Sequence, residues 1–361
     1  MLFIFCVPVL YVGAVGDSAK ASVVINAENG EIIYSKNADE KLPMASTTKI
    51  MTALLLCEYG NADRQIEVTK EMVTVEGSSM GLLPGDTVTL NDLLYGMLLA
   101  SGNDAANTTA FVVGGSIEGF VELMNSKAKE LGLKNTHFVT PSGLDAKEHY
   151  TTAYELALLA AYAIKNERFK AASSSKSAVL NYGNPPYRRT LTNHNRLLKS
   201  YEGLIGVKTG FTKKSGRCLV TAAERDGKRV VAVTLCDPND WADHKNLLDY
   251  GFTKLKTVTV EPESKTVSIF VVGGSEKEIT ADIPAVTFNT VGEKEITSKI
   301  ITEKFLYAPI AVGQKVGKVC YYSNGKIVKE KDICSSVNVK SAETKITEKI
   351  KNNFLYILSC I

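Results

Sequence analysis

Apolar runs in the first two thirds of the chain are spaced in ways that predict both strands and helices. Residues 21–25 and 32–35 are short, β-branched runs on either side of Asn29-Gly30, a hairpin turn signal. The continuous apolar run 50–57 is typical of a buried helix. Helical spacing also predicts helices at 91–99, 117–131, 151–164 and 241–250, the first of them capped by Asn91.

Further strands are predicted at 203–210, 218–223 and 230–235, the last two joined by the tight turn Asp226-Gly227. The stretch 166–198 is polar, contains Pro185-Pro186 and is predicted to be irregular. Strands that are interleaved with helices favour one α/β (α+β) domain over residues 21–256.

The pattern changes after this domain. Short runs rich in Val, Ile and Thr, separated by glycines, predict a small all-β domain at 257–335. Helical spacing returns in the tail, 336–361, where an apolar stripe is formed by Ile346, Ile350, Phe354, Ile357 and Ile361. The last apolar run is too short to cross a bilayer, so we expect an amphipathic helix lying on the membrane surface. The alternative is a helix packed on the protein's own body.

The first residues resemble an export signal. Positions 2–15 are apolar or small and carry no charge before Asp17, although the usual basic residue in front of such a segment is missing. We therefore predict a signal-peptide-like segment at 1–20, with cleavage near 12–14 or near 19–21, and an exported protein.

Composition narrows the classes of function. The chain has 361 residues, of which 45% are hydrophobic and 22% charged, as in ordinary globular proteins. The net charge is only +3 and basic residues do not cluster, which argues against a nucleic-acid partner. Neither the seven cysteines nor the four histidines show metal-ligand spacing, so no metal site or other cofactor is predicted.

The strongest candidate for chemistry is Ser46 at the start of the 50–57 helix. Lys49 lies three residues later and therefore on the same helix face, within reach of the hydroxyl. A serine needs an adjacent base to become a nucleophile, and a lysine can be that base only when it is neutral. The Ser-x-x-Lys pattern also occurs at Ser126, Ser173 and Ser323, but only Ser46 combines a helix start with an apolar helix behind it.

A competing motif is rejected. Residues 77–81 read Gly-Ser-Ser-Met-Gly, the pattern of a nucleophile elbow, which requires a strand before it and a long helix after it. Here a Leu-Leu-Pro-Gly-Asp turn follows, so we predict a loop.

Three short motifs occur in order along the chain: Ser-Thr-Thr-Lys at 46–49, Ser-Gly-Asn at 101–103 and Lys-Thr-Gly at 208–210. Such a set is typical of penicillin-binding proteins and class A β-lactamases. With residues 44–55, 77–106, 140–144, 203–219 and Ala308-Pro309-Ile310, the chain resembles low-molecular-weight penicillin-binding proteins, specifically serine-type D-alanyl-D-alanine carboxypeptidases. The resemblance implies a transpeptidase/β-lactamase-like α/β catalytic domain, a β-rich second domain and a C-terminal membrane anchor.

The resemblance also implies a reaction on peptidoglycan stem pentapeptides at the outer face of the cytoplasmic membrane or in the cell wall. Ser46 would attack the carbonyl between two terminal D-alanines, with Lys49 as base and Ser101 as proton relay. Substrate binding would involve Asn103, Lys208, Thr209, Gly210 and, through its backbone N–H, Phe211. Arg217 is an additional candidate for the substrate carboxylate, although a surface arginine is the simpler interpretation.

The chain lacks a Glu-x-x-Leu-Asn string between 104 and 207, the source of the deacylating glutamate in class A β-lactamases. β-Lactams are therefore expected to acylate the protein and stay bound as covalent inhibitors. A DD-endopeptidase remains an alternative, because sequence does not show pocket breadth. A catalytically idle penicillin-binding scaffold is another, which the three intact motifs disfavour.

Overall fold

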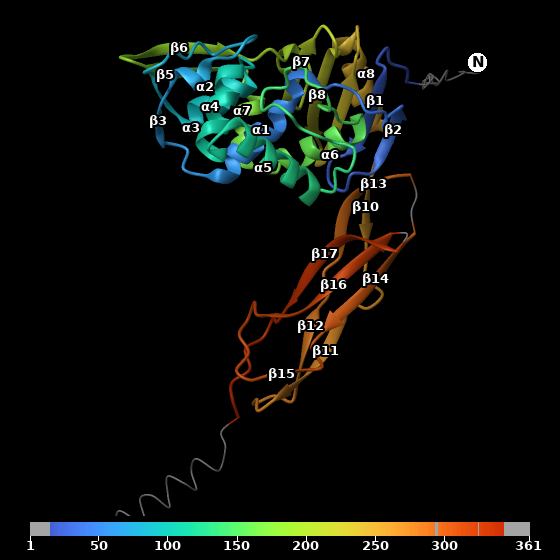
Figure 1. Ribbon diagram of the computed structural model, residues 1–361. Coiled ribbons are helices and arrows are strands. Elements are labelled where there is room, and N and C mark those ends of the chain that lie inside the picture. Colours follow the sequence, from blue (N-terminus) through green and yellow to red (C-terminus); the bar gives the residue numbers. More distant parts are fainter. Residues whose placement is uncertain (1–14, 293–294, 324, 343–361) are drawn as a thin grey trace, which may run out of the picture. The chain divides into compact units, whose positions relative to one another are not determined.

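The computed structural model describes residues 15–292, 295–323 and 325–342, and it divides into two compact units between Leu255 and Lys256 (Figure 1). The first unit contains a sheet with helices, and the second is built from strands alone within its described residues. The export signal up to residue 14 and the tail from residue 343 lie outside the described residues.

The first unit is organised on a five-stranded antiparallel sheet in the order β2-β1-β9-β8-β7. Its strands are β1 (Ala21–Asn26), β2 (Ile32–Lys36), β7 (Leu204–Thr212), β8 (Gly216–Arg225) and β9 (Lys228–Leu235). The two hairpins predicted at Asn29-Gly30 and Asp226-Gly227 are confirmed. β7 is at one edge of this sheet, which matters for the site below.

Both faces of the sheet are covered. Val23 and Ile25 of β1 join the main hydrophobic core with α1 (Lys49–Tyr59) and α6 (Ala153–Ala163). Val24 faces the opposite way, toward α8 (Asp240–Lys254), where a Cβ on Gly251 would lie 2.9 Å from Val24 Cγ1. Because both faces are buried, β1 is apolar without a strict alternation.

The remaining helices build the part of the unit beside β7. They are η1 (Ala45–Thr48), α2 (Lys70–Val73), α3 (Leu90–Leu98), α4 (Asn103–Gly114), α5 (Ile117–Glu130), α7 (Glu167–Ser174) and η2 (Arg196–Lys199). The helices predicted at 50–57, 91–99, 117–131, 151–164 and 241–250 are all present, with ends that differ by a few residues. The helix α4 was not predicted.

Two expectations about local structure were wrong. The cap of α3 is Thr89 rather than Asn91, because Thr89 Oγ1 accepts the Asp92 N–H while the Asp92 carboxylate accepts the Thr89 N–H. The stretch 166–198 is ordered: α7 buries Phe169, and a hairpin follows it. Its strands, β5 (Ser177–Gly183) and β6 (Pro186–Thr192), form a second sheet with β3 (Gln65–Glu67) and β4 (Thr87–Thr89).

Residues 17 and 18 belong to the folded unit. The Asp17 carboxylate accepts hydrogen bonds from Ser22 at 2.7 Å and from Tyr34 at 2.8 Å, and Ser18 Oγ lies 2.7 Å from a carboxylate oxygen of both Asp237 and Asp243. Cleavage near 19–21 would remove these contacts. They therefore favour the earlier of the two cleavage positions, while cleavage itself stays a prediction.

The second unit confirms the predicted all-β character. It contains three small sheets: β10 (Leu255–Val260) with β13 (Val286–Val291), then β12 (Glu278–Asp282) with β11 (Thr266–Val272) and β15 (Phe305–Tyr307), and β14 (Ile296–Thr302) with β16 (Lys315–Ser323) and β17 (Lys326–Cys334). Its own hydrophobic core includes Ile269, Val319 and Tyr321. Across the described residues of both units, no helix is long and apolar enough to span a membrane.

Candidate active site

Ser46 lies in η1, the short helix that leads directly into α1, and β7 packs against this turn. The close approach depends on Gly210: a Cβ there would lie 3.1 Å from Ser46 N, Thr47 N and Met44 O. Gly210 therefore allows the strand to lie against the backbone that carries Ser46. This is a second reason for a glycine there, beside the bare strand edge expected from the sequence.

Lys49 is wholly buried and contacts Ser46 as the spacing predicted. Its Nζ lies 2.9 Å from Ser46 Oγ, 2.7 Å from Asn103 Oδ1 and 2.6 Å from the Ser142 carbonyl oxygen. Ser142 is in a loop fixed beside α1, because Thr52 donates a hydrogen bond of 2.6 Å to the neighbouring Pro141 carbonyl. The three partners of the amine are thus a hydroxyl, an amide and a carbonyl.

Burial and a second cation favour the neutral amine. Burial first, and then the nearby charge of Lys208, hold the pKa of Lys49 well below its ordinary value of 10.5. A neutral amine has two N–H donors and one lone pair. Asn103 Oδ1 and Ser142 O can only accept, so they take the two N–H groups, and the lone pair is left for the Ser46 hydroxyl. The geometry suits proton transfer from Ser46 to Lys49.

Ser101 lies in the short connection between α3 and α4, and Asn103 is the first residue of α4. Ser101 is buried and has a left-handed backbone, with φ of 60°. Asn103 connects two parts of the site, because its amide oxygen accepts from Lys49 while its Nδ2 donates to the Glu76 carbonyl at 2.6 Å. The adjacent Asp104 carboxylate accepts the backbone N–H groups of Met80, Gly81 and Leu82. Residues 77–81 are thus an irregular loop, and rejection of the nucleophile elbow is confirmed.

Lys208, Thr209, Gly210 and Phe211 follow one another on the edge strand β7. Lys208 is buried, its Nζ donates to the Thr209 carbonyl at 2.9 Å, and burial lowers its pKa to about 7. Phe211 is 65% exposed beside them. An edge strand has free backbone donors and acceptors, so an extended peptide can pair with it.

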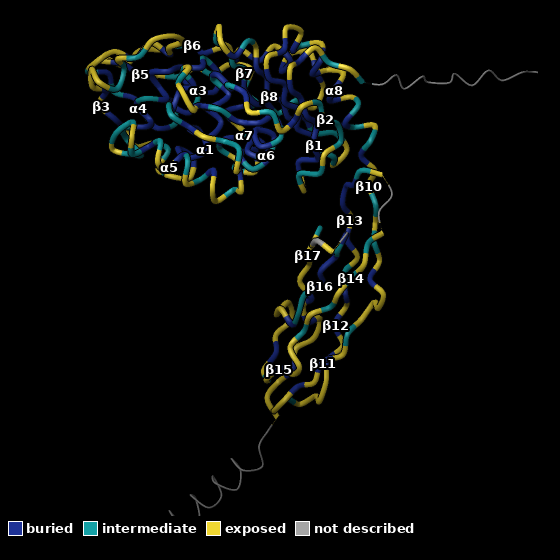
Figure 2. The backbone as a smooth tube through the Cα atoms, turned by 45° about the vertical axis from the view of Figure 1, so that its right-hand side comes forward, coloured by how far each residue is buried: buried dark blue, intermediate teal, exposed yellow. Residues whose placement is uncertain are grey.

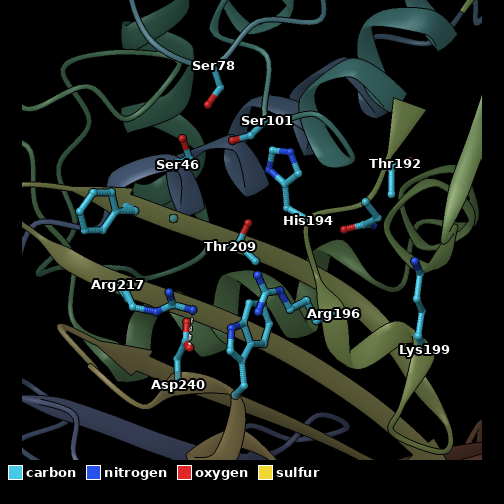
Figure 3. Close-up of a pocket in the computed structure, with 14 residues that line it drawn as sticks. Ser46, Ser78, Ser101, Thr192, His194, Arg196, Lys199, Thr209, Arg217 and Asp240 are labelled. Atoms are coloured by element: carbon cyan, nitrogen blue, oxygen red, sulfur yellow. Dashed lines mark hydrogen bonds and ion pairs between the residues drawn. The ribbon is translucent and has the colours of Figure 1, made fainter. Parts of the chain in front are cut away.

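A groove of about 560 Å³ opens over these elements (Figure 3). Of the predicted residues, Ser46, Ser101, Thr209, Gly210 and Phe211 line it, whereas Lys49, Asn103 and Lys208 are buried and do not reach its lining. Figure 3 shows the hydroxyls of Ser46 and Ser101 on one side of the groove and that of Thr209 on the other. The three motifs are therefore assembled into one site.

The groove contains further residues that the sequence did not reveal. Ser78, Thr192, His194, Arg196, Lys199, Asp240 and Trp241 also line it. Arg217, opposite Phe211 on β8, is an exposed arginine that also lines the groove, and it binds Asp240 at 2.7 Å and lies 5.5 Å from the Trp241 ring. These residues come from the 77–81 loop, the end of β6 and the loop after it, η2, β8 and α8, and no local motif connects them. Only Arg217 was noticed, through its closeness to Lys-Thr-Gly.

Comparison with known proteins agrees with this geometry. The sequence model of the D-alanyl-D-alanine carboxypeptidase family matches residues 13–239, and that of the penicillin-binding protein 5 C-terminal domain matches residues 254–341. D-alanyl-D-alanine carboxypeptidase DacF of Bacillus subtilis is 34% identical over 90% of this chain and 86% of its own length. DacC of Escherichia coli is 35% identical over 89% and 84%.

Solved structures lead to the same group. Penicillin binding protein 5 from Haemophilus influenzae aligns with a TM-score of 0.68 and 26% identity, covering 91% of this chain and 100% of that one. D-alanyl-D-alanine carboxypeptidase DacD from Francisella tularensis aligns with a TM-score of 0.67 and 26% identity, over 91% and 95%.

Proposed function

The chain belongs to the D-alanyl-D-alanine carboxypeptidase family, and we propose that it carries out this reaction on peptidoglycan stem peptides through an acyl-enzyme on Ser46. The family is penicillin-binding and acts on the cell wall. One observation carries the assignment of the nucleophile: the Lys49 amine is buried, its pKa is lowered by that burial, and it lies 2.9 Å from Ser46 Oγ. The remaining roles follow from the groove around this pair.

In the first half of the reaction, Lys49 takes the Ser46 proton as Oγ attacks the carbonyl between the two terminal D-alanines. The backbone N–H groups of Ser46 and Phe211 stabilise the oxyanion that forms. Ser101 passes a proton to the departing D-alanine amine. The products of this half-reaction are free D-alanine and a peptide esterified to Ser46, and water then hydrolyses the ester.

Substrate binding is assigned to the two walls of the groove. The stem peptide pairs with the open edge of β7, which Gly210 leaves free of a side chain. Asn103 Nδ2 donates one N–H to the Glu76 carbonyl, and its second N–H donates toward the peptide backbone of the substrate. Thr209 faces the terminal carboxylate with a hydroxyl, the buried Lys208 adds a positive charge when the bound carboxylate keeps it protonated, and Arg217, held by Asp240, adds positive charge from β8.

The location of the reaction is also a proposal. Because the substrate of the family is in the cell wall, we place the protein outside the cytoplasmic membrane, after export by its first residues. The amphipathic stripe of the tail would hold it at the lipid surface.

The test is the mass of the intact protein after mixing with benzylpenicillin, together with D-alanine release from a stem pentapeptide. Wild type and the Ser126→Ala control should gain the mass of the drug and release D-alanine, whereas Ser46→Ala should do neither. Acylation without D-alanine release would favour an idle scaffold or a different peptide bond. Rapid loss of the adduct with hydrolysed drug would indicate a β-lactamase, and absence of any adduct would refute the assignment of Ser46.

A further inference from the structure

The neighbouring strands β11 and β15 of the second unit carry an apolar surface that the catalytic chemistry does not use, bordered on β12 by Glu278, which lies opposite Phe270. Ile269, Val271 and Leu306 point into the core of this unit. Phe270, Val272, Phe305 and Tyr307, which we call the aromatic patch, alternate with them and are 67%, 45%, 46% and 68% exposed. Figure 2 shows this exposure along β11 and β15.

The aromatic patch is compact. β11 and β15 are parallel neighbours, with Phe270 opposite Phe305 and Val272 opposite Tyr307. The rings of Phe305 and Tyr307 meet edge to face, with centroids 5.4 Å apart. The same face of β11 begins with Thr266 and Ser268, so it changes from polar to apolar along the strand. A strand face that only contacts water would be expected to stay polar along its whole length.

The polypeptide leaves the described structure next to the apolar end. The Ala342 N–H donates to the Gly273 carbonyl at 2.8 Å, and Ser341 pairs with Gly274. Gly273 directly follows Val272 of the aromatic patch. The last described residue, Ala342, is therefore hydrogen-bonded to the residue that directly follows β11, and the apolar stripe of the tail begins four positions later in the sequence, at Ile346.

The small area of the aromatic patch argues against two occupants, the tail helix of the same chain and a second copy of the chain. If the tail is the helix that its sequence predicts, its stripe from Ile346 to Ile361 extends over about 23 Å. The patch covers about 7 Å along two strands that are about 4.8 Å apart. It could cover only a small part of the stripe. A second copy of the chain fits no better, because four half-exposed side chains offer roughly 400 Å², about half of what each partner in a stable dimer buries.

We propose that the aromatic patch inserts into the headgroup region of the membrane as a second lipid contact beside the tail. A lipid surface needs no matched shape and accepts Phe and Tyr at its boundary. A lipid surface is large enough to contact both the apolar stripe of the tail and the aromatic patch. Neither the tail helix nor a second copy of the chain could cover both. The inference deepens the proposed location at the membrane surface and rests on it, but it is independent of the proposed reaction.

The test uses the full chain and a single fluorescent indole. Trp241 is the only tryptophan, so Trp241→Phe gives a silent background into which Tyr307→Trp is introduced. Vesicles of phosphatidylglycerol and phosphatidylethanolamine should shift the emission of the new indole to the blue, and lipids brominated on the acyl chain should quench it. Ile327→Trp is the matched control, because Ile327 is apolar and 52% exposed but lies in β17, in a different sheet. Its emission should not change.

Two further variants separate the patch from the tail. Phe270→Ser with Phe305→Ser should lower vesicle affinity about tenfold, because binding to the membrane surface scales with the apolar area that is buried. Release of D-alanine from a soluble pentapeptide, measured without vesicles, should be unchanged. Ile350→Glu with Phe354→Glu, in the tail, should abolish sedimentation with vesicles and with it the emission shift.

Four outcomes would overturn the proposal. Sedimentation with vesicles while the indole at position 307 keeps the emission of a water-exposed group would mean that the tail alone contacts lipid. Blue emission without vesicles that the tail variant reverses would place the tail on the patch. Blue emission that grows with protein concentration would place a second copy there. Failure of wild type to bind vesicles would remove the lipid surface altogether, whether or not D-alanine is released.

Discussion

At the scale of single residues, the chemistry depends on how Lys49 is surrounded. The amine is buried away from water, and two of its partners, Asn103 Oδ1 and the Ser142 carbonyl oxygen, only accept hydrogen bonds. These two contacts fix the direction of the amine's lone pair. The spacing of Ser46 and Lys49 was readable from the sequence, because residues three apart on a helix are neighbours. The contribution of Ser142 was not, since its carbonyl is brought in by a loop nearly a hundred positions away.

Lys49→Met should remove the base and keep the apolar stem. We expect the rate of acylation by benzylpenicillin to fall by about 10²–10⁴, the usual contribution of a positioned base. Stopped-flow kinetics with a chromogenic β-lactam would measure it. Lys129→Met is the matched control, because Lys129 closes another Ser-x-x-Lys sequence on the exposed surface of α5. An equal loss in both variants would contradict the role of Lys49.

Lys208 gives a prediction about stability and pH. Burial lowers its pKa from 10.5 to about 7, so between these values the unfolded chain holds a proton that the folded protein has released. Unfolding free energy therefore rises with pH across this window, by at most about 1.4 kcal/mol per unit. Lys208→Met lacks this contribution. Urea unfolding of both proteins from pH 7 to pH 10 should show wild type gaining on the variant, and a constant difference would count against the shifted pKa.

At the scale of elements, the sequence predicted the parts of the fold that have strong local signals. Hairpins at Asn-Gly and Asp-Gly turns and helices with apolar spacing were found where expected. The hairpin β5–β6 was missed because only part of one face is covered, so it contains few apolar residues, and Pro185-Pro186 looked like the centre of a loop. In the groove, the cluster of Arg196, Arg217 and Trp241 is formed by tertiary packing alone.

The packing of β7 against η1 can be tested at Gly210. In Gly210→Ala, the new methyl would lie 3.1 Å from three backbone atoms, so the strand and the Ser46 turn must separate by a few tenths of an ångström. We expect a loss of roughly 1–3 kcal/mol in stability. The rate of acylation should also fall, because the backbone N–H of Ser46 moves relative to that of Phe211 and the two no longer bind the same oxyanion well. Thermal unfolding and acylation rates would be compared with Gly16→Ala, where a Cβ has nothing within 4 Å. A variant as active and stable as that control would exclude the tight contact.

At the scale of the whole molecule, the two units have separate hydrophobic cores, and all residues assigned to the reaction lie in the first. We therefore expect two transitions in differential scanning calorimetry. Acylation by benzylpenicillin should raise the melting temperature of only one of them, since the ligand is held only by that folded unit. Val319→Ala, in the core of the second unit, should lower only the other. A single transition that moves as one in both experiments would show that the units unfold cooperatively.

The amide of Asn103, 2.7 Å from Lys49 Nζ, makes the site sensitive to exchange of this amide for a carboxylate, by mutation or by deamidation. A carboxylate in its place would have almost the same shape, but its second oxygen would lie against the Glu76 carbonyl, to which the amide now donates at 2.6 Å, and two acceptors repel each other. It would also pair with the buried amine, raise its pKa and keep the proton on it. A single base change in an asparagine codon, or slow deamidation of the finished protein, is enough to make this exchange. Exchange of this one side chain would therefore remove the neutral base and, at the same time, one of the contacts that hold the loop at Glu76.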